Sequence, residues 1–210
     1  MTSEPQPQYA DRRYRSGSAL AAGVLLLGLM AWMGGDAILR GEGRMPLTAA
    51  AALLFLVPLV VAFTLRPVVL AGDRRIRVRN PFRTISAPWG SVETVRAGYS
   101  CELLADGSKY QLWSIPVSLR ARGKANRHNQ RLAAGQQPRT GPFGLGGVTE
   151  QSTQEQTAPS DIAVAELREL AERHHGSEDA QGPVTVRWAW EILAPLGAGA
   201  VALLLVWLTS

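Results

Sequence analysis

Three long apolar runs constrain this chain more than any other feature of its sequence. They lie at residues 19–38, 47–65 and 188–208. Each run approaches the roughly 20 apolar residues, at about 1.5 Å of rise each, that a helix needs to cross a hydrocarbon core about 30 Å thick. We therefore expect three transmembrane helices, the first two forming a helical hairpin. The segment between the second and third runs is left to form a small domain outside the bilayer.

The charges that flank the runs predict their orientation. Arginines are denser before the first run and after the second run than in the short connection between them. Positively charged flanks stay in the cytoplasm, so we expect the N-terminus and the domain there and the C-terminus outside. Arg187, Trp188 and Trp190 are predicted to mark the cytoplasmic start of the third helix. A signal peptide is the alternative for the first run, but the run lacks a convincing cleavage site and a second run follows directly.

Two segments read as disordered. Residues 1–18 are polar and show no apolar periodicity. Residues 119–159 begin with a basic part, continue through a Gly/Pro-rich part and end in a Gln/Thr/Ser/Glu-rich part, which predicts a disordered insertion. Much of the formal net charge of +5 comes from arginine, a bias that also fits a GC-rich genome. The single cysteine, Cys101, excludes an intramolecular disulfide, so no oxidising compartment is required.

The period of the sequence changes to two in residues 66–118, which predicts a β-domain. Ile76 and Val78 alternate with arginines, and Asn80-Pro81 then turns the chain into a returning strand. Period-two alternation places one face in a core and the other in solvent. Further alternation and a hairpin turn at residues 106–108 give five or six strands in an antiparallel meander.

An amphipathic helix is predicted at residues 160–175. Ile162, Val164, Leu167 and Leu170 form an apolar stripe at helical spacing, and Ser160 is a suitable N-cap. Such a helix is suited to cap an open barrel. The predicted fold is therefore a three-helix membrane protein with a cytoplasmic α+β domain, an antiparallel half-barrel capped by a C-terminal helix.

Several residues in this domain resemble a known family. They are Arg79-Asn80-Pro81-Phe82-Arg83, Ile85, Pro88-Trp89, Val92 and Val95, followed by Lys109-Tyr110-Gln111-Leu112-Trp113 and Ile115-Pro116. They resemble the bacterial pleckstrin-homology (PH) domain of the actinobacterial type typified by the low-molecular-weight protein antigen 6 family. The resemblance implies a seven-strand half-barrel with a C-terminal capping helix, in a protein of the bacterial inner membrane. It transfers no active site, because the matching residues are packing residues, and the long insertion before the capping helix departs from the family pattern.

The candidate site residues fall into two groups. The predicted fold-determining core consists of Ile76, Val78, Ile85, Trp89, Tyr110, Leu112 and Trp113. The candidate contacts to anionic lipid head groups are Arg75, Arg77, Arg79 and Arg83, at roughly 1 kcal/mol per basic residue near a membrane surface. Arginines beside a membrane helix are also expected for orientation alone. That second interpretation is favoured, and the first stays open.

No catalytic constellation is present in the sequence. It has no Ser/His/Asp or Cys/His arrangement, paired carboxylates, phosphate-binding loop or metal-ligand spacing, so we predict no enzyme, cofactor or metal. Residues 120–139 are basic but lack interleaved aromatics, which argues against nucleic acid as a partner. We predict a membrane-anchored PH-like binding or scaffolding module with an unidentified protein partner, and possible added-strand recognition. The alternative is an accessory subunit of a membrane transport or envelope complex that acts through its helices.

Overall fold

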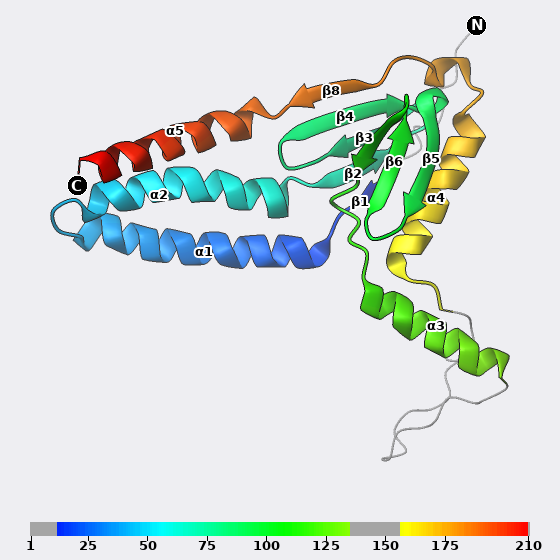
Figure 1. The fold of residues 1–210 in the computed structure, drawn as a ribbon, viewed down its shortest axis with the longest axis horizontal. Helices are drawn as coiled ribbons and strands as arrows, with labels where there is room; N and C mark the ends of the chain where they lie inside the picture. Colours follow the sequence, from blue (N-terminus) through cyan, green and yellow to red (C-terminus); the bar gives the residue numbers. More distant parts are fainter. Residues whose placement is uncertain (1–11, 135–155, 210) are drawn as a thin grey trace, which may run out of the picture.

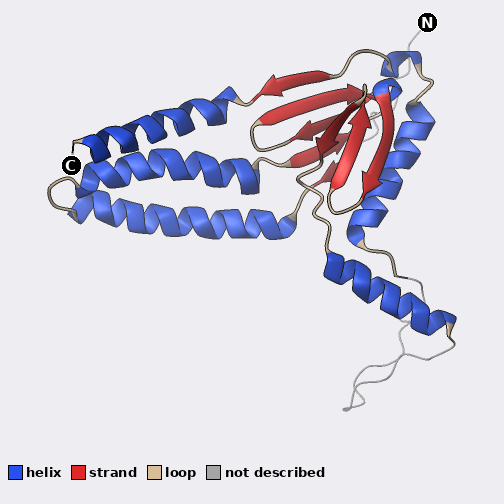
Figure 2. Cartoon of the chain, viewed as in Figure 1, coloured by secondary structure: helices blue, strands red, loops and turns tan. Residues whose placement is uncertain are grey.

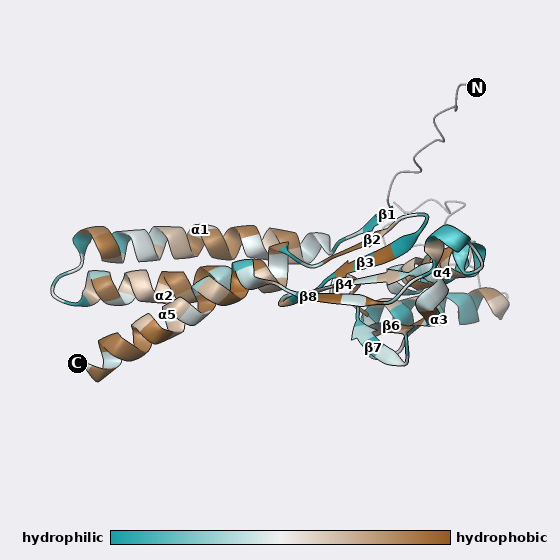
Figure 3. Ribbon diagram, turned by 90° about the horizontal axis from the view of Figure 1, so that it is seen from above, coloured by the Kyte–Doolittle hydropathy of each residue, from teal (hydrophilic) through white to brown (hydrophobic). Residues whose placement is uncertain are grey.

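The protein is elongated, with a helical bundle at one end and a β-rich domain at the other (Figure 1). This is a computed structural model, and it describes residues 12–134 and 156–209. In this described part, three helices are long and apolar enough to cross a membrane. They are α1 (Gly17–Arg40), α2 (Met45–Val60) with its π-helical extension η1 (Val61–Leu65), and α5 (Trp190–Leu208). Figure 3 shows the hydrophobic colour running along these helices.

The third helix begins later than predicted. Arg187 and Trp188 belong to the strand β8 (Thr185–Trp188), and α5 starts at Trp190. The strand ends there because Ala189 donates its backbone N–H to Phe82 and accepts the first bonds of the helix. The prediction that these two residues mark the helix start is therefore wrong in its local structure.

Helix α2 lies at the centre of the bundle, and both α1 and α5 pack against it. Glycines permit the close approach. A Cβ at Gly23 would collide with the side chain of Thr64, and a Cβ at Gly34 would lie 2.7 Å from Leu53. A Cβ at Gly199 would lie 2.5 Å from the backbone nitrogen of Phe55. The bundle therefore depends on small residues at its contacts, as helices in lipid commonly do.

The described residues form two antiparallel sheets (Figure 2). The larger sheet has the order β1-β2-β3-β4-β8 and the smaller has the order β5-β6-β7. The remaining strands are β1 (Arg12–Tyr14), β2 (Val68–Ala71), β3 (Arg75–Arg79), β4 (Arg83–Pro88), β5 (Val92–Ala97), β6 (Cys101–Ala105) and β7 (Ser108–Gln111). Asp106 and Gly107 both have positive φ, 48° and 66°, so the predicted hairpin turn joins β6 to β7.

The larger sheet extends beyond the predicted β-domain. Residues 66–118 supply β2 to β7, but β1 comes from the predicted tail 1–18 and β8 lies after the insertion. The prediction of disorder is therefore wrong for residues 12–14, because their backbone groups pair with β2. It is also wrong at the end of the predicted tail, because α1 already begins at Gly17. Residues 1–11 lie outside the described residues. Three strands of this sheet connect directly to the bundle (Figure 1). Strand β1 leads into α1, strand β2 follows the end of α2 and η1, and strand β8 leads into α5.

The core lies between the two sheets and helix α4 (Pro159–His174). Of the seven predicted core residues, Ile76, Val78, Ile85, Trp89 and Leu112 are buried in it, and Tyr110 packs against it while partly exposed. Trp113 is 45% exposed and contacts Phe63 edge-on instead. The prediction that Trp113 lies in the core is therefore wrong. Leu112 points into the core, so the next residue, Trp113, points away from it.

Helix α4 contributes Leu167 and its neighbours to this core. It begins at Pro159 with Ala158 in the cap position, so Ser160 is not the N-cap and its side chain is buried in the first turn. Strand β1 is tied to α4, because the Tyr14 hydroxyl donates to Glu166 at 2.6 Å. Burial, and then this bond to a carboxylate, raise the pKa of Tyr14 to about 12, so the phenol keeps its proton.

The insertion contains a helix, α3 (Leu119–Ala133), so the prediction of disorder over 119–159 is wrong for those residues. Ser118 caps the helix by accepting from the backbone N–H of Ala121. Arg122 Nε lies 3.0 and 3.1 Å from the two carboxylate oxygens of Asp161 on α4, and its Nη1 donates to the carbonyl of Gly98 at 2.8 Å. These contacts anchor a segment whose composition alone reads as disordered. Residues 135–155 of the insertion lie outside the described residues.

Replacing Arg122 by alanine should release α3 from the domain. The variant loses a bidentate ion pair to Asp161 and two hydrogen bonds to backbone carbonyls. The intrinsic helix propensity of α3 is modest, because it contains Gly123 and two asparagines. Hydrogen exchange of the amides in 119–133 should therefore accelerate by about tenfold or more, equivalent to about 1.5 kcal/mol. Arg120→Ala is the control, because Arg120 is exposed on the same helix and should change exchange little. Equal effects of the two substitutions would contradict the anchoring role.

Candidate anion-binding face

The outer face of the larger sheet carries a pattern of arginines and hydroxyls that follows from strand register. Arg79 pairs with Thr84 and Thr84 pairs with Arg187, across β3, β4 and β8. One step further along the strands, Arg77 pairs with Ser86 and Ser86 pairs with Thr185. Residues that are directly paired point to the same side of a sheet. We call the first set (Arg79, Thr84, Arg187) the near row and the second set (Arg77, Ser86, Thr185) the far row.

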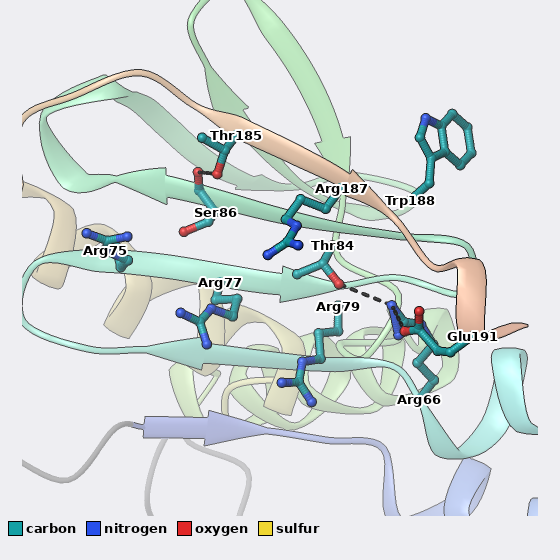
Figure 4. A pocket seen from close by; sticks show the side chains of 10 residues that line it. All are labelled: Arg66, Arg75, Arg77, Arg79, Thr84, Ser86, Thr185, Arg187, Trp188 and Glu191. Carbon is teal, nitrogen blue, oxygen red and sulfur yellow. Dashed lines mark hydrogen bonds and ion pairs between the residues drawn. The ribbon is translucent and has the colours of Figure 1, made fainter.

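The two rows form the floor of an open groove with a volume of about 550 Å³. The groove is lined by Arg66, Arg75, Arg77, Arg79, Thr84, Ser86, Thr185, Arg187, Trp188 and Glu191. Figure 4 shows Arg66 and Glu191 at the end of the sheet where α2 and α5 meet it, and Arg75 at the opposite end. The near row is therefore the row closer to the helices.

The groove is strongly positive. Five arginines and one glutamate among the described residues line it, which gives a formal charge of +4 (five minus one). Within the described part of the chain, the side chains of Arg75, Arg77, Arg79 and Arg187 make no hydrogen bond or ion pair with the protein. Guanidinium groups side by side repel one another, and a bound anion would relieve that repulsion.

Arg66 differs from the other arginines of the groove, because described residues of the protein hold its side chain in place. Its Nε donates to the carbonyl of Pro81 at 3.2 Å and its Nη2 donates to Thr84 Oγ1 at 3.1 Å. The same Nη2 lies 3.1 Å from Glu191 Oε1. The Arg66 side chain is 12% exposed, whereas that of Glu191 is 66% exposed. Burial lowers the pKa of Arg66, an effect that Glu191 opposes, and an arginine remains charged regardless.

The structure brings together three of the four arginines predicted as head-group contacts. Arg75, Arg77 and Arg79 line the groove. Arg83 shares the inner side of β4 with Ile85, and its guanidinium lies 5.8 Å from the ring centroid of Tyr110. Arg83 therefore does not belong to the outer face. Alternate residues of a strand share a side, so Arg83 lies with Ile85, and Thr84 and Ser86 lie on the outer face.

Sequence reasoning missed Arg66 and Arg187 as members of the groove. Arg66 directly follows the second apolar run, so it is one of the flanking arginines whose position is explained by orientation alone. Arg187 was assigned to the start of the third helix. The signal for Arg187 was available, since Thr185 and Arg187 alternate with Val186 and Trp188 as strand residues do.

Other side-chain chemistry is sparse. Among the described residues, no three of His, Cys, Asp and Glu gather as a metal site would require. Cys101 is buried in the core, and burial raises the pKa of its thiol, which makes the thiol unreactive. The arginine groove is therefore the feature of the described surface with the clearest binding chemistry.

The segment that supplies most of this groove also has a family match. Residues 66–140 match a bacterial PH domain family model. The resemblance inferred from the sequence is confirmed over that segment. The PH match contains β3 and β4, which carry most of the groove, whereas Arg187 of β8, strand β1 and helix α4 lie beyond it. No curated protein and no solved structure matches the chain.

Proposed function

We propose that the protein is a membrane-anchored PH-like binding or scaffolding module without catalytic activity, which binds anionic lipid head groups through its arginine face. The observation that carries the proposal is the groove itself, in which four arginines have no hydrogen-bond or ion-pair partner among the described residues, and two of them, Arg79 and Arg187, lie toward the ends of α2 and α5. The bacterial PH match supports a binding role. A protein partner stays a prediction.

The placement in the cell is part of the proposal. Helices α1, α2 and α5 would cross the bacterial inner membrane, with the domain in the cytoplasm and the C-terminus outside. Large apolar side chains on these helices, such as Leu25, Trp32 and Leu39, are exposed, which suits lipid better than water. The arginines on both sides of the first two helices support the orientation. The alternative, an accessory subunit that acts through its helices, stays a prediction.

The test compares two short-chain lipids that differ in head-group charge. Purified full-length protein in neutral detergent is titrated with dihexanoyl phosphatidylglycerol or dihexanoyl phosphatidylcholine, and thermal stabilisation gives the affinity. The triple variant Arg75→Gln, Arg77→Gln and Arg79→Gln should lose about 3 kcal/mol of binding free energy to the anionic lipid, roughly 1 kcal/mol per charge.

The matched control removes the same charge elsewhere. Arg120, Lys124 and Arg127 are exposed on α3, away from the groove, and their replacement by glutamine should leave binding unchanged. The proposal fails if the unmodified protein binds the two lipids equally, or if the control triple variant loses as much affinity as the groove variant.

A further inference from the structure

We propose that the near row and Arg66 form a cradle for the phosphate monoester of one lipid head group, which binds by replacing the carboxylate of Glu191 on Arg66. The inference rests on the proposed function, because it assumes that the arginine face binds anions. It adds the chemical class of the anion, its position in the groove and the protein group that it displaces.

The cradle follows from register. Thr84 is paired on one side with Arg79 and on the other with Arg187, so the three side chains stand in line on the outer face. Adjacent strands lie about 4.8 Å apart, which places an arginine on each side of the threonine. Arg66 reaches the same threonine from the helix end, with Nη2 3.1 Å from Thr84 Oγ1 (Figure 4). Three arginines and one threonine therefore stand beside one another at the helix end of the outer face.

The donors at this position suit a phosphate better than a carboxylate. Thr84 Oγ1 accepts from Arg66, so its own proton remains available to an anion. Guanidinium groups bind phosphate through pairs of parallel N–H donors. A phosphate monoester presents three terminal oxygens, enough to share among three arginines and a hydroxyl. A carboxylate presents only two oxygens and would leave part of the cradle without an acceptor.

The carboxylate of Glu191 contacts Arg66 at this position. Glu191 lies on the first turn of α5, and its Oε1 is 3.1 Å from Arg66 Nη2. Arg66 is nearly buried and is also held by the carbonyl of Pro81, whereas Glu191 is largely exposed. When an anion competes for the pair, the arginine stays in place and the glutamate turns into solvent. The incoming phosphate takes over the contact with the nearly buried Arg66, so that charge stays paired while the Glu191 carboxylate gains water.

The position of the cradle favours a membrane lipid over a soluble phosphate. Arg66 follows directly on the apolar helix Met45–Leu65, and Glu191 lies at the start of the apolar helix Trp190–Leu208. Trp188, 59% exposed, lines the same groove, and tryptophan favours the head-group level of a bilayer. The far row lies two residues further from the helices, about 6.8 Å along the strands. A lipid phosphate therefore reaches the near row first.

The test measures binding of dihexanoyl phosphatidic acid to the full-length protein in neutral detergent. Glu191→Gln should bind about fivefold more tightly, because a competing negative charge is removed from the site. Arg79→Gln and Arg187→Gln should each bind about tenfold more weakly, since each removes a charge-assisted donor. Arg75→Gln makes the same charge change at the far end of the groove and should alter affinity by less than about threefold, because the site is more distant. Glu191→Asp, whose shorter side chain retracts the charge, should fall between wild type and Glu191→Gln.

Each result decides a different point. Binding that is no tighter in Glu191→Gln, or as weak in Arg75→Gln as in Arg79→Gln, overturns the cradle while the face can still bind anions. Equal binding of dihexanoyl phosphatidic acid and dihexanoyl phosphatidylcholine by the unmodified protein overturns the proposed function as well. If glycerol phosphate binds as tightly as dihexanoyl phosphatidic acid, the inference that the bound phosphate belongs to a membrane lipid is wrong. Ligand-free thermal unfolding of each variant shows whether it has kept its fold.

Discussion

Replacement of Trp89 by alanine is expected to lower the free energy of unfolding of the β-domain by about 3–5 kcal/mol. The Trp89 side chain is fully buried in the core. Its indole Nε1 donates to the carbonyl of Gly72 at 2.8 Å, so the substitution also leaves a part-buried acceptor without its partner. Most small domains have only 5–15 kcal/mol of stability, and the variant should be largely unfolded at moderate temperature.

Trp113 provides a matched control for this prediction. It is the same residue type in the same domain, but it is 45% exposed and packs only against Phe63 among aromatic rings of the described residues. Trp113→Ala should cost about 2 kcal/mol, less than Trp89→Ala, since nearly half of its indole is already in solvent. Urea unfolding of the full-length protein in detergent, followed by near-ultraviolet circular dichroism, measures both variants. If Trp89→Ala were no less stable than Trp113→Ala, the core would be centred elsewhere.

The fold of the central strands could be predicted because the relevant signal is local. Ile76 and Val78 alternate with arginines over five residues, and this alternation alone fixes which face is buried. The turn at Asp106-Gly107 is local in the same sense, because two adjacent residues with positive φ define it. The apolar runs are the strongest local signal of all, and their helices differ from the predicted bounds by only a few residues.

The remaining features depend on contacts between distant residues. Strand β8 pairs with β4 about a hundred residues earlier, for example Arg187 with Thr84, and nothing local announces that pairing. Helix α3 is held by Arg122 through a bond to Asp161 beyond the insertion. The intrinsic helix propensity of residues 119–133 is weak, and the helix is stabilised by its contacts with the folded domain.

The candidate site was partly predictable for the same reason. Three arginines of the groove follow from the alternation of β3, whereas Arg66 and Arg187 join them only through the tertiary fold. Arg83 was included by charge alone. Strict use of the two-residue period would have placed it with Ile85 on the inner face, where the structure has it.

Gly199→Leu is expected to separate α5 from α2. A Cβ at Gly199 would lie 2.5 Å from the backbone nitrogen of Phe55 and 2.7 Å from the carbonyl carbon of Leu54. These are backbone atoms of a helix and cannot turn away as a side chain does, so the helices must move apart. Overpacking of this kind costs about 3 kcal/mol, and more when backbone must shift.

Gly197 supplies the control for this substitution, because it lies on the same helix and a Cβ there meets nothing within 4 Å. Gly197→Leu should leave the packing intact and, by the higher helix propensity of leucine, should not weaken α5. Thermal unfolding and limited proteolysis of the purified protein in detergent compare the two variants. Because α5 continues from β8, its displacement by Gly199→Leu should also loosen the β4–β8 pairing that carries Thr84 and Arg187. Lipid binding should then weaken in Gly199→Leu and persist in Gly197→Leu, and similar behaviour of both variants would show that this contact does not support the groove.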